Sequence, residues 1–375
     1  MIYFDNAATS AYKPKGVQEA LIYDLTHSAN SGRSGHKYAL DAAVKIEDCR
    51  RYLGEALNAP EQEYSVLFTK NCTEALNLGI FGFLREGMRV VTTAFDHNSV
   101  LRPLFELERR GKIQLFVVEP TEDGVISPEH LDRALENADF CAVSAVSNVT
   151  GAKLNMSELS KSAKKYGVIT LIDGAQAVPI VDVNMKKYSF DMLAAPGHKG
   201  LHGVQGTGFL VARKDLQLQP LLMGGTGTAS NSTFQPTEPP EAYEAGTLFA
   251  GGIAALHAGA KWSFQNRERS AFNIARLADE LIEYLRVLGA EIYTKDGSMG
   301  VVSFNLKNKD SSFVADLLSE RDFAVRAGLH CAPLTHRYLK TENRGAVRVS
   351  IGVDNTDKEI YQFVATLERI NAIKR

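Results

Sequence analysis

An acid and a lysine near the middle of the chain have the residue types and spacing for cofactor chemistry. Asp173 ends the apolar run VITLI, and Lys199 follows a second apolar run, around residues 190–195, in a glycine-flanked turn. Strand ends of this kind can face one cavity in an α/β protein. A lysine amine can bind the aldehyde of pyridoxal phosphate, and a carboxylate can keep its pyridine nitrogen protonated. The alternative is a buried acid beside a surface lysine, and these two residues leave both interpretations open.

The strings around these two residues are more specific. DGAQAV (173–178) and GHK (197–199) are accompanied, in matching order along the chain, by DNAAT, DHNSV, SNVTG, EAGT and RAGLHCAP. Together they resemble the class V aminotransferases, which are fold-type I pyridoxal phosphate enzymes and include the cysteine desulfurases. The likeness covers nearly the whole chain. It implies an α/β fold, with a large domain around a mostly parallel seven-stranded sheet and a smaller α+β C-terminal domain.

The resemblance implies three catalytic or substrate-binding roles. Lys199 would bind pyridoxal phosphate and then remove the substrate α-proton, while Asp173 holds the ring nitrogen. His97 would by itself be an ordinary loop histidine, but the matching histidine stacks on the ring and can move protons. Arg348 matches the arginine that binds the substrate carboxylate, for which its two-pronged fork is suited. The alternative for Arg348 is an exposed strand arginine.

The same resemblance supplies the remaining cofactor contacts. A strand followed by a helix start near residue 72 presents N–H groups to an anion, a weak signal by itself. Thr247 matches a residue that reaches the phosphate in the partner subunit, which implies a homodimer with shared active sites. The other implied contacts are Cys72 and Thr73 at the phosphate, Asn148 at the phenolic oxygen or substrate, and Gln176 and His198 near the phenolic oxygen and phosphate.

Cys331 could distinguish one reaction of this family from the others. A free cysteine is usually an inert packing residue, but Arg326, Pro333 and two histidines indicate a polar loop beside positive charge, where a thiolate is favoured. The segment RAGLHCA also resembles the cysteine loop of group II cysteine desulfurases. The resemblance implies conversion of L-cysteine to L-alanine with a persulfide on Cys331, and a sulfur-acceptor protein as a further partner.

Two alternatives to this activity remain open. Another class V reaction, such as selenocysteine lysis, transamination or epimerisation, would use Lys199 without needing Cys331. The second is a non-enzymatic or metal-binding α/β protein. His330, Cys331 and His336 are loosely spaced and lack a second ligand pair, so no metal is expected.

The elements that must position these residues alternate along the first two thirds of the chain. Apolar runs such as YSVLFT, MRVVTT, IQLFVV, ADFCAVS and GVITLID are separated by helical patterns, which indicates a mostly parallel sheet covered on both faces. From about residue 254 the pattern changes to long helices and short strands. We expect a large cofactor-binding domain at 14–250 and a small domain formed by 1–13 and 251–375. The Gly-, Ser-, Thr- and Pro-rich segment 224–240 is expected to be a loop.

Composition narrows the range of partners. The 375 residues carry a formal charge of −2 and are 45% hydrophobic, and Lys and Arg are scattered, which argues against nucleic-acid binding. No stretch approaches the length of a membrane span and the N-terminus lacks a signal pattern, so a cytoplasmic location is expected. The four cysteines show no CxxC spacing, which suits a reducing compartment. Cys49 and Cys141 fall in apolar elements and are expected in the core.

Overall fold

The large sheet of the protein has the predicted number of strands. The structure is a computed structural model, which describes residues 1–27, 29–31, 34–228 and 230–373. Its seven-stranded sheet has the order β2-β8-β7-β6-β5-β3-β4. Neighbouring strands from β7 to β4 pair in parallel, whereas β8 pairs antiparallel with both β7 and β2. The strands are β2 (Tyr64–Thr69), β3 (Arg89–Thr93), β4 (Gln114–Val118), β5 (Phe140–Ser144), β6 (Ile169–Asp173), β7 (Met192–Pro196) and β8 (Gly208–Arg213).

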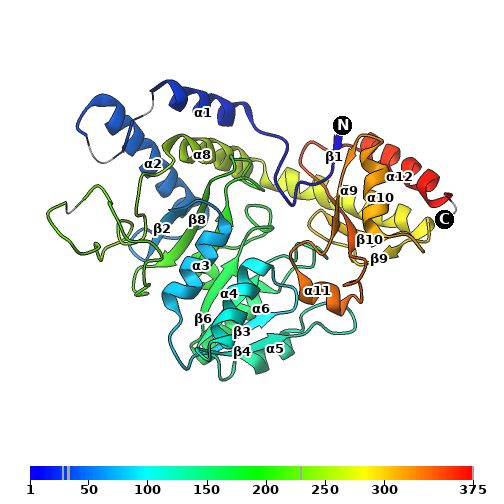
Figure 1. Cartoon of the computed structure of the whole chain (residues 1–375), viewed down its shortest axis with the longest axis horizontal. Coiled ribbons are helices and arrows are strands. Elements are labelled where there is room, and N and C mark those ends of the chain that lie inside the picture. Colours follow the sequence, from blue (N-terminus) through cyan, green and yellow to red (C-terminus); the bar gives the residue numbers. More distant parts are fainter. Residues whose placement is uncertain (28, 32–33, 229, 374–375) are drawn as a thin grey trace.

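Helices cover both faces of this sheet because its central strands are apolar on both sides. Along β5, Phe140 and Ala142 belong to one buried cluster, and Cys141 and Val143 belong to another. Successive side chains of a strand point to opposite faces, so the sheet carries one cluster on each face. Figure 1 shows the surrounding helices. They are α1 (Lys15–His27), α2 (Lys37–Ala56), α3 (Cys72–Phe83), α4 (Asn98–Arg109), α5 (Pro128–Leu135), α6 (Met156–Tyr166), α7 (Met185–Tyr188) and α8 (Ala250–Gln265).

The last third of the chain forms a second, smaller α+β unit, as predicted. Its four-stranded antiparallel sheet has the order β12-β13-β10-β9. A third buried cluster lies here and includes Phe4 from the N-terminal segment; Figure 1 shows β1 beside these C-terminal elements. The elements are β1 (Ile2–Tyr3), α9 (Arg267–Val287), β9 (Glu291–Ile292), β10 (Val301–Asn305), α10 (Ser311–Ser319), β11 (Phe323–Ala324), β12 (Arg326–Gly328), α11 (Pro333–Tyr338), β13 (Ala346–Ser350) and α12 (Asp357–Asn371).

The position of α8 bears on where the two domains divide. Ile253, Leu256 and Ala260 of α8 are buried in the cluster that packs on the large sheet, and α8 packs against α1 and α2. We therefore propose that the large domain continues to the end of α8, at Gln265, and that the small domain contains the remaining C-terminal residues together with the N-terminal segment.

Three further features can be compared with expectation. The described residues of segment 224–240 contain no helix or strand; Ala229 lies outside the described residues. Among the helices that the structure describes, none has the length and apolar character needed to cross a membrane. Cys49 and Cys141 are fully buried among apolar side chains, as predicted.

Gly345 packs closely against Gly328, which ends strand β12 just before the Cys331 loop. Gly345 has a φ of +62°, and a Cβ at this position would lie 2.6 Å from the Cα atom of Gly328. We expect Gly345→Ala to lower the free energy of unfolding by roughly 2–4 kcal/mol, since left-handed strain and overpacking add. Gly289→Ala is the matched control, because its φ is +72° but its Cβ would meet open space. Urea denaturation measures both variants, and equal losses would contradict the steric argument.

Candidate active site

Four segments bring polar side chains to the carboxyl edge of the parallel strands. His97 follows β3, Asn148 follows β5, Asp173 ends β6, and Lys199 follows β7. These side chains line one cavity. The structure therefore brings together the following residues that the sequence singled out: Cys72, Thr73, His97, Asn148, Asp173, Gln176, His198 and Lys199.

Asp173 and Lys199 face the cavity with perturbed ionisation. Burial lowers the pKa of the Lys199 amine, although the nearby Asp173 carboxylate opposes this shift. A lowered pKa increases the fraction of free amine, which is the nucleophilic form. Burial raises the pKa of Asp173, while the N–H of Ala175, which donates to its Oδ1 at 2.9 Å, and the charge of Lys199 lower it. The pair has the groups needed to bind an aldehyde and to contact a ring nitrogen.

The N-terminus of α3 forms another wall of the cavity. Asn71 caps this helix, since its side chain accepts a hydrogen bond from the N–H of Glu74. Free N–H groups and the helix dipole at such an end favour an anion. Cys72 is buried, with its Sγ atom 3.7 Å from Oδ1 of Asp173. Burial and the Asp173 carboxylate raise the pKa of this thiol, so it remains neutral. Its side chain thus contacts the acid as well as lining the predicted phosphate end.

Two histidines of the cavity are held in the neutral form. Burial lowers the pKa of His97 to about 4, and the charges of Lys199, Arg326 and Arg348 act in the same direction. Burial and the charge of Lys199 also lower the pKa of His198 to about 4. Neutral imidazoles can donate one hydrogen bond and accept another. Both histidines therefore remain versatile polar contacts at neutral pH.

Arg348 on β13 connects the small domain to the cavity wall. It is buried, and its Nη2 atom lies 2.8 Å from Oδ1 of Asp5, while its Nη1 donates to the carbonyl of Asn148 at 3.1 Å. The Nε atom has no hydrogen-bond partner among the described residues. Two of the five N–H donors of a guanidinium are thus used, and others remain for a carboxylate. Arg348 is buried and ion-paired, which removes the alternative of an exposed strand arginine.

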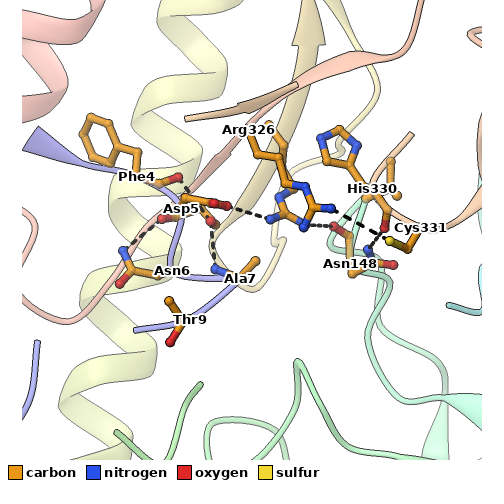
Figure 2. Close-up of polar contacts among 12 residues, drawn as sticks. Phe4, Asp5, Asn6, Ala7, Thr9, Asn148, Arg326, His330 and Cys331 are labelled. Atoms are coloured by element: carbon orange, nitrogen blue, oxygen red, sulfur yellow. Dashed lines mark hydrogen bonds and ion pairs between the residues drawn. The ribbon is translucent and has the colours of Figure 1, made fainter. Parts of the chain in front are cut away.

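Cys331 lies on a short loop beside the cavity and differs from the other cysteines. Its side chain is exposed, whereas Cys49, Cys72 and Cys141 are buried. An Nη2 atom of Arg326 lies 3.8 Å from the Cys331 sulfur, and Figure 2 shows this contact. Of the four cysteines, Cys331 is therefore the one whose side chain is exposed next to a guanidinium.

Backbone contacts hold this loop against the cavity. The side-chain Nδ2 of Asn148 donates to the His330 carbonyl at 2.7 Å (Figure 2), and the N–H of Asn98 donates to the Cys331 carbonyl at 2.7 Å. His330 and Cys331 have φ values of 50° and 57°. Non-glycine residues seldom adopt this left-handed conformation, which costs about 1–3 kcal/mol and persists where surrounding contacts enforce it. The loop is therefore fixed at two points, one of which, Asn148, lines the cavity.

Other residues lie apart from the cavity or were missed by the sequence analysis. Thr247 is exposed and does not line the cavity in this single chain. Gln176 does line it, and its Nε2 donates to the carbonyl of Ala7 at 3.0 Å. Asp5 and Ser99 were given no role from the sequence, yet they contact Arg348 and His97 respectively. A serine two residues after a histidine at a helix start is a signal that could have indicated the second contact.

The parallel sheet, the lysine and acid at its carboxyl edge and the adjoining helix N-terminus define the protein as an α/β enzyme of the phosphate-cofactor type. A model of the Aminotransferase class-V family matches residues 2–363, and the chain belongs to this family. It is 34% identical to a probable cysteine desulfurase of Pyrococcus abyssi, over 99% of this chain and 94% of that protein.

Two further similarities agree with this assignment. The chain is 33% identical to a probable cysteine desulfurase of Methanothermobacter thermautotrophicus, over 98% of this chain and 94% of that protein. Its fold matches the apo structure of a cysteine desulfurase from Thermococcus onnurineus NA1 with a TM-score of 0.92 and 34% identity, covering 98% of this chain and 94% of that one. The similarity thus extends over both domains.

The cavity fits the pyridoxal phosphate on which enzymes of this family depend. Asn148 Oδ1 and His198 Nδ1 are buried without a hydrogen-bond partner in the part of the chain that the structure describes, and both residues line the cavity. Buried polar atoms without partners are costly, so these two indicate contacts to a polar ligand. The α3 N-terminus suits its phosphate, Asp173 its ring nitrogen and Lys199 its aldehyde.

Proposed function

We propose that this protein is a pyridoxal phosphate-dependent cysteine desulfurase, which converts L-cysteine to L-alanine and collects the sulfur as a persulfide on Cys331. The observation that carries the proposal is the exposed Cys331 thiol, paired with Arg326 on a loop bound to the cavity residue Asn148. Two relatives that are 34% and 33% identical are named as probable cysteine desulfurases, which supports the same substrate. Other class V reactions would have no use for a thiol in this position.

Several residues that line the cavity would hold the cofactor. Cys72 and Thr73 would lie at its phosphate with His198, and Asp173 would contact its ring nitrogen. Gln176 and Asn148 would lie near its phenolic oxygen. Bound pyridoxal phosphate supplies an aldehyde that takes up an amino group and a ring that accepts electrons from the α-carbon.

The chain's own residues would bind and orient the substrate. Arg348 would bind the substrate carboxylate through its free donors, with Asp5 and the Asn148 carbonyl fixing the plane of its fork. The free amine of Lys199, favoured by burial, would take the α-proton. Contacts from three parts of the chain would therefore orient the β-carbon and its sulfur relative to Cys331.

The sulfur transfer would balance without an added oxidant or reductant. The thiolate of Cys331 attacks the substrate sulfur, a sulfur–sulfur bond forms, and the carbon–sulfur bond breaks. The electrons of the broken bond remain with the β-carbon, which takes a proton and becomes the methyl group of alanine. Arg326 would hold the thiolate for attack.

We propose that the enzyme is a homodimer with shared active sites. Thr247 is exposed here, as a residue that contacts the cofactor of a partner would be. Apolar side chains on α1, on α2 and near Thr247 are also exposed, including Ile22, Leu25, Val44 and Phe249. Exposed apolar surface of this kind is typical of subunit contacts. A sulfur-acceptor protein would be a further, transient partner.

Product analysis tests the proposed activity directly. We expect the protein, supplied with pyridoxal phosphate and L-cysteine, to form alanine, and to release equimolar sulfide when a reductant is present. Parallel reactions with selenocysteine, with an amino donor and a keto acid, and with a single enantiomer of alanine cover the other class V reactions. If one of those were fast and alanine did not form from cysteine, the desulfurase proposal would be wrong.

A further inference from the structure

The hydrogen bonds at the start of α4 determine which ring nitrogen of His97 carries a proton. His97 is the N-cap residue of this helix, and its Nδ1 accepts a hydrogen bond from the backbone N–H of Ser99 at 3.0 Å. A backbone N–H can only donate. The Nδ1 atom of His97 must therefore present a lone pair, and it carries no proton.

The hydroxyl groups of Ser99 and Thr73 form a chain of contacts that ends at Nδ1 of His97. The Ser99 Oγ atom lies 2.9 Å from Nδ1 of His97. Because Nδ1 has no proton, a hydrogen bond in this second contact has Ser99 Oγ as its donor, and the hydroxyl shares the Nδ1 lone pair with the backbone N–H. The Thr73 Oγ1 atom lies 2.8 Å from Ser99 Oγ. When the single hydroxyl hydrogen of Ser99 points at Nδ1, Thr73 is the donor to Ser99 Oγ.

A neutral imidazole has one N–H, and here it must be at Nε2. This is the ring nitrogen that remains for a ligand, since His97 lines the cavity and its Nδ1 is occupied. We propose that Ser99 and Thr73 are positioning residues that fix His97 as the Nε2–H tautomer, so that His97 meets the cavity ligand as a hydrogen-bond donor and not as a base.

The charges around His97 also favour its neutral form. Burial lowers the pKa of His97 to about 4, and the protonated form of Lys199 (after β7) and the guanidinium groups of Arg326 (β12), Arg348 (β13) and Arg102 (α4) act in the same direction. The imidazolium form would also lose both donors to Nδ1. His97 is thus neutral at neutral pH, and the ring nitrogen that it presents to the cavity carries the proton and donates a hydrogen bond. This inference rests on the proposed function only for the identity of the ligand that His97 meets in the cavity.

Histidine-selective ¹⁵N NMR of the full-length holoenzyme reads the tautomer without measuring activity. The His97 signals are assigned from their loss in His97→Gln. We expect Nδ1 to resonate as an unprotonated nitrogen and Nε2 as a protonated one, with no change between about pH 6 and pH 8, because the pKa lies well below this range. A protonated Nδ1 in the parent would overturn the proposal.

Three variants test the positioning role. Ser99→Ala removes one donor to Nδ1 but keeps the backbone N–H, and we expect the ratio of the two tautomers to fall about fivefold, the effect of one typical hydrogen bond. Thr73→Val should produce a smaller change in the same direction. Ser127→Ala removes a hydroxyl at the start of α5 and should leave the His97 signals unchanged. Signals in Ser99→Ala identical to those of the parent would overturn the role of Ser99, whereas failure of the desulfurase proposal would appear separately, as no alanine from the parent.

Discussion

Lys199→Ala is expected to abolish both covalent attachment of pyridoxal phosphate and turnover of cysteine. Lys199 lies in the cavity where Asp173 faces it, and its pKa is lowered by burial, so it is the amine suited to bind the aldehyde and to take a proton. Borohydride reduction followed by peptide mass spectrometry should locate the cofactor on Lys199 in the parent and on no lysine of the variant. Alanine formation should fall by several orders of magnitude, as it does when a reacting group is removed.

An exposed lysine provides the matched control. Lys164 is on the solvent side of α6, and Lys164→Ala should retain the reducible cofactor and normal turnover. A cofactor still fixed to protein by borohydride in Lys199→Ala would contradict the assignment and would direct attention to another amine. Loss of attachment in both variants would instead indicate that attachment is sensitive to charge alone.

The sequence predicted the part of the site that depends on local pattern. Asp173 closes an apolar run, and such a run ends at the edge of the sheet where the ends of parallel strands gather. The same logic placed Asn148 after β5 and Lys199 after β7, and the structure brings all three to one cavity. Whether a residue lies at the end of a strand follows from its neighbours in the sequence. These three positions could therefore be predicted without knowledge of distant contacts.

Contacts between distant segments could not be obtained in this way. Asp5 and Arg348 are paired because β1 joins β11 and packs in the small-domain cluster, a pairing that links residues at opposite ends of the chain. In the sequence, DNAAT is one of several strings that match the family. Local pattern gives no reason to pair its acid, Asp5, with a particular arginine. The position of α8 is a similar case, since its apolar residues would suit either domain, and the proposal that it belongs to the large domain rests on tertiary packing.

Cys331→Ala is expected to separate cofactor binding from sulfur transfer. Cys331 does not line the cavity that contains Lys199, so the variant should bind pyridoxal phosphate and show a spectral change when L-cysteine is added. It should nevertheless form alanine several orders of magnitude more slowly, because the nucleophile that takes the sulfur is missing. Mass spectrometry of the parent during turnover should show one added sulfur on the peptide that contains Cys331.

The buried cysteines make the test specific. Cys49 is enclosed in the core on α2, and burial raises the pKa of its thiol, so Cys49→Ala should cost some stability but leave both alanine and the persulfide. Cys331→Ser keeps the size and polarity of the side chain and should fail as Cys331→Ala does, since a hydroxyl is not ionised at neutral pH. Parent-like alanine formation by Cys331→Ala would mean that sulfur leaves without a protein thiol. The exposed cysteine beside Arg326 would then be incidental, and a class V reaction that needs Lys199 alone would replace the desulfurase proposal.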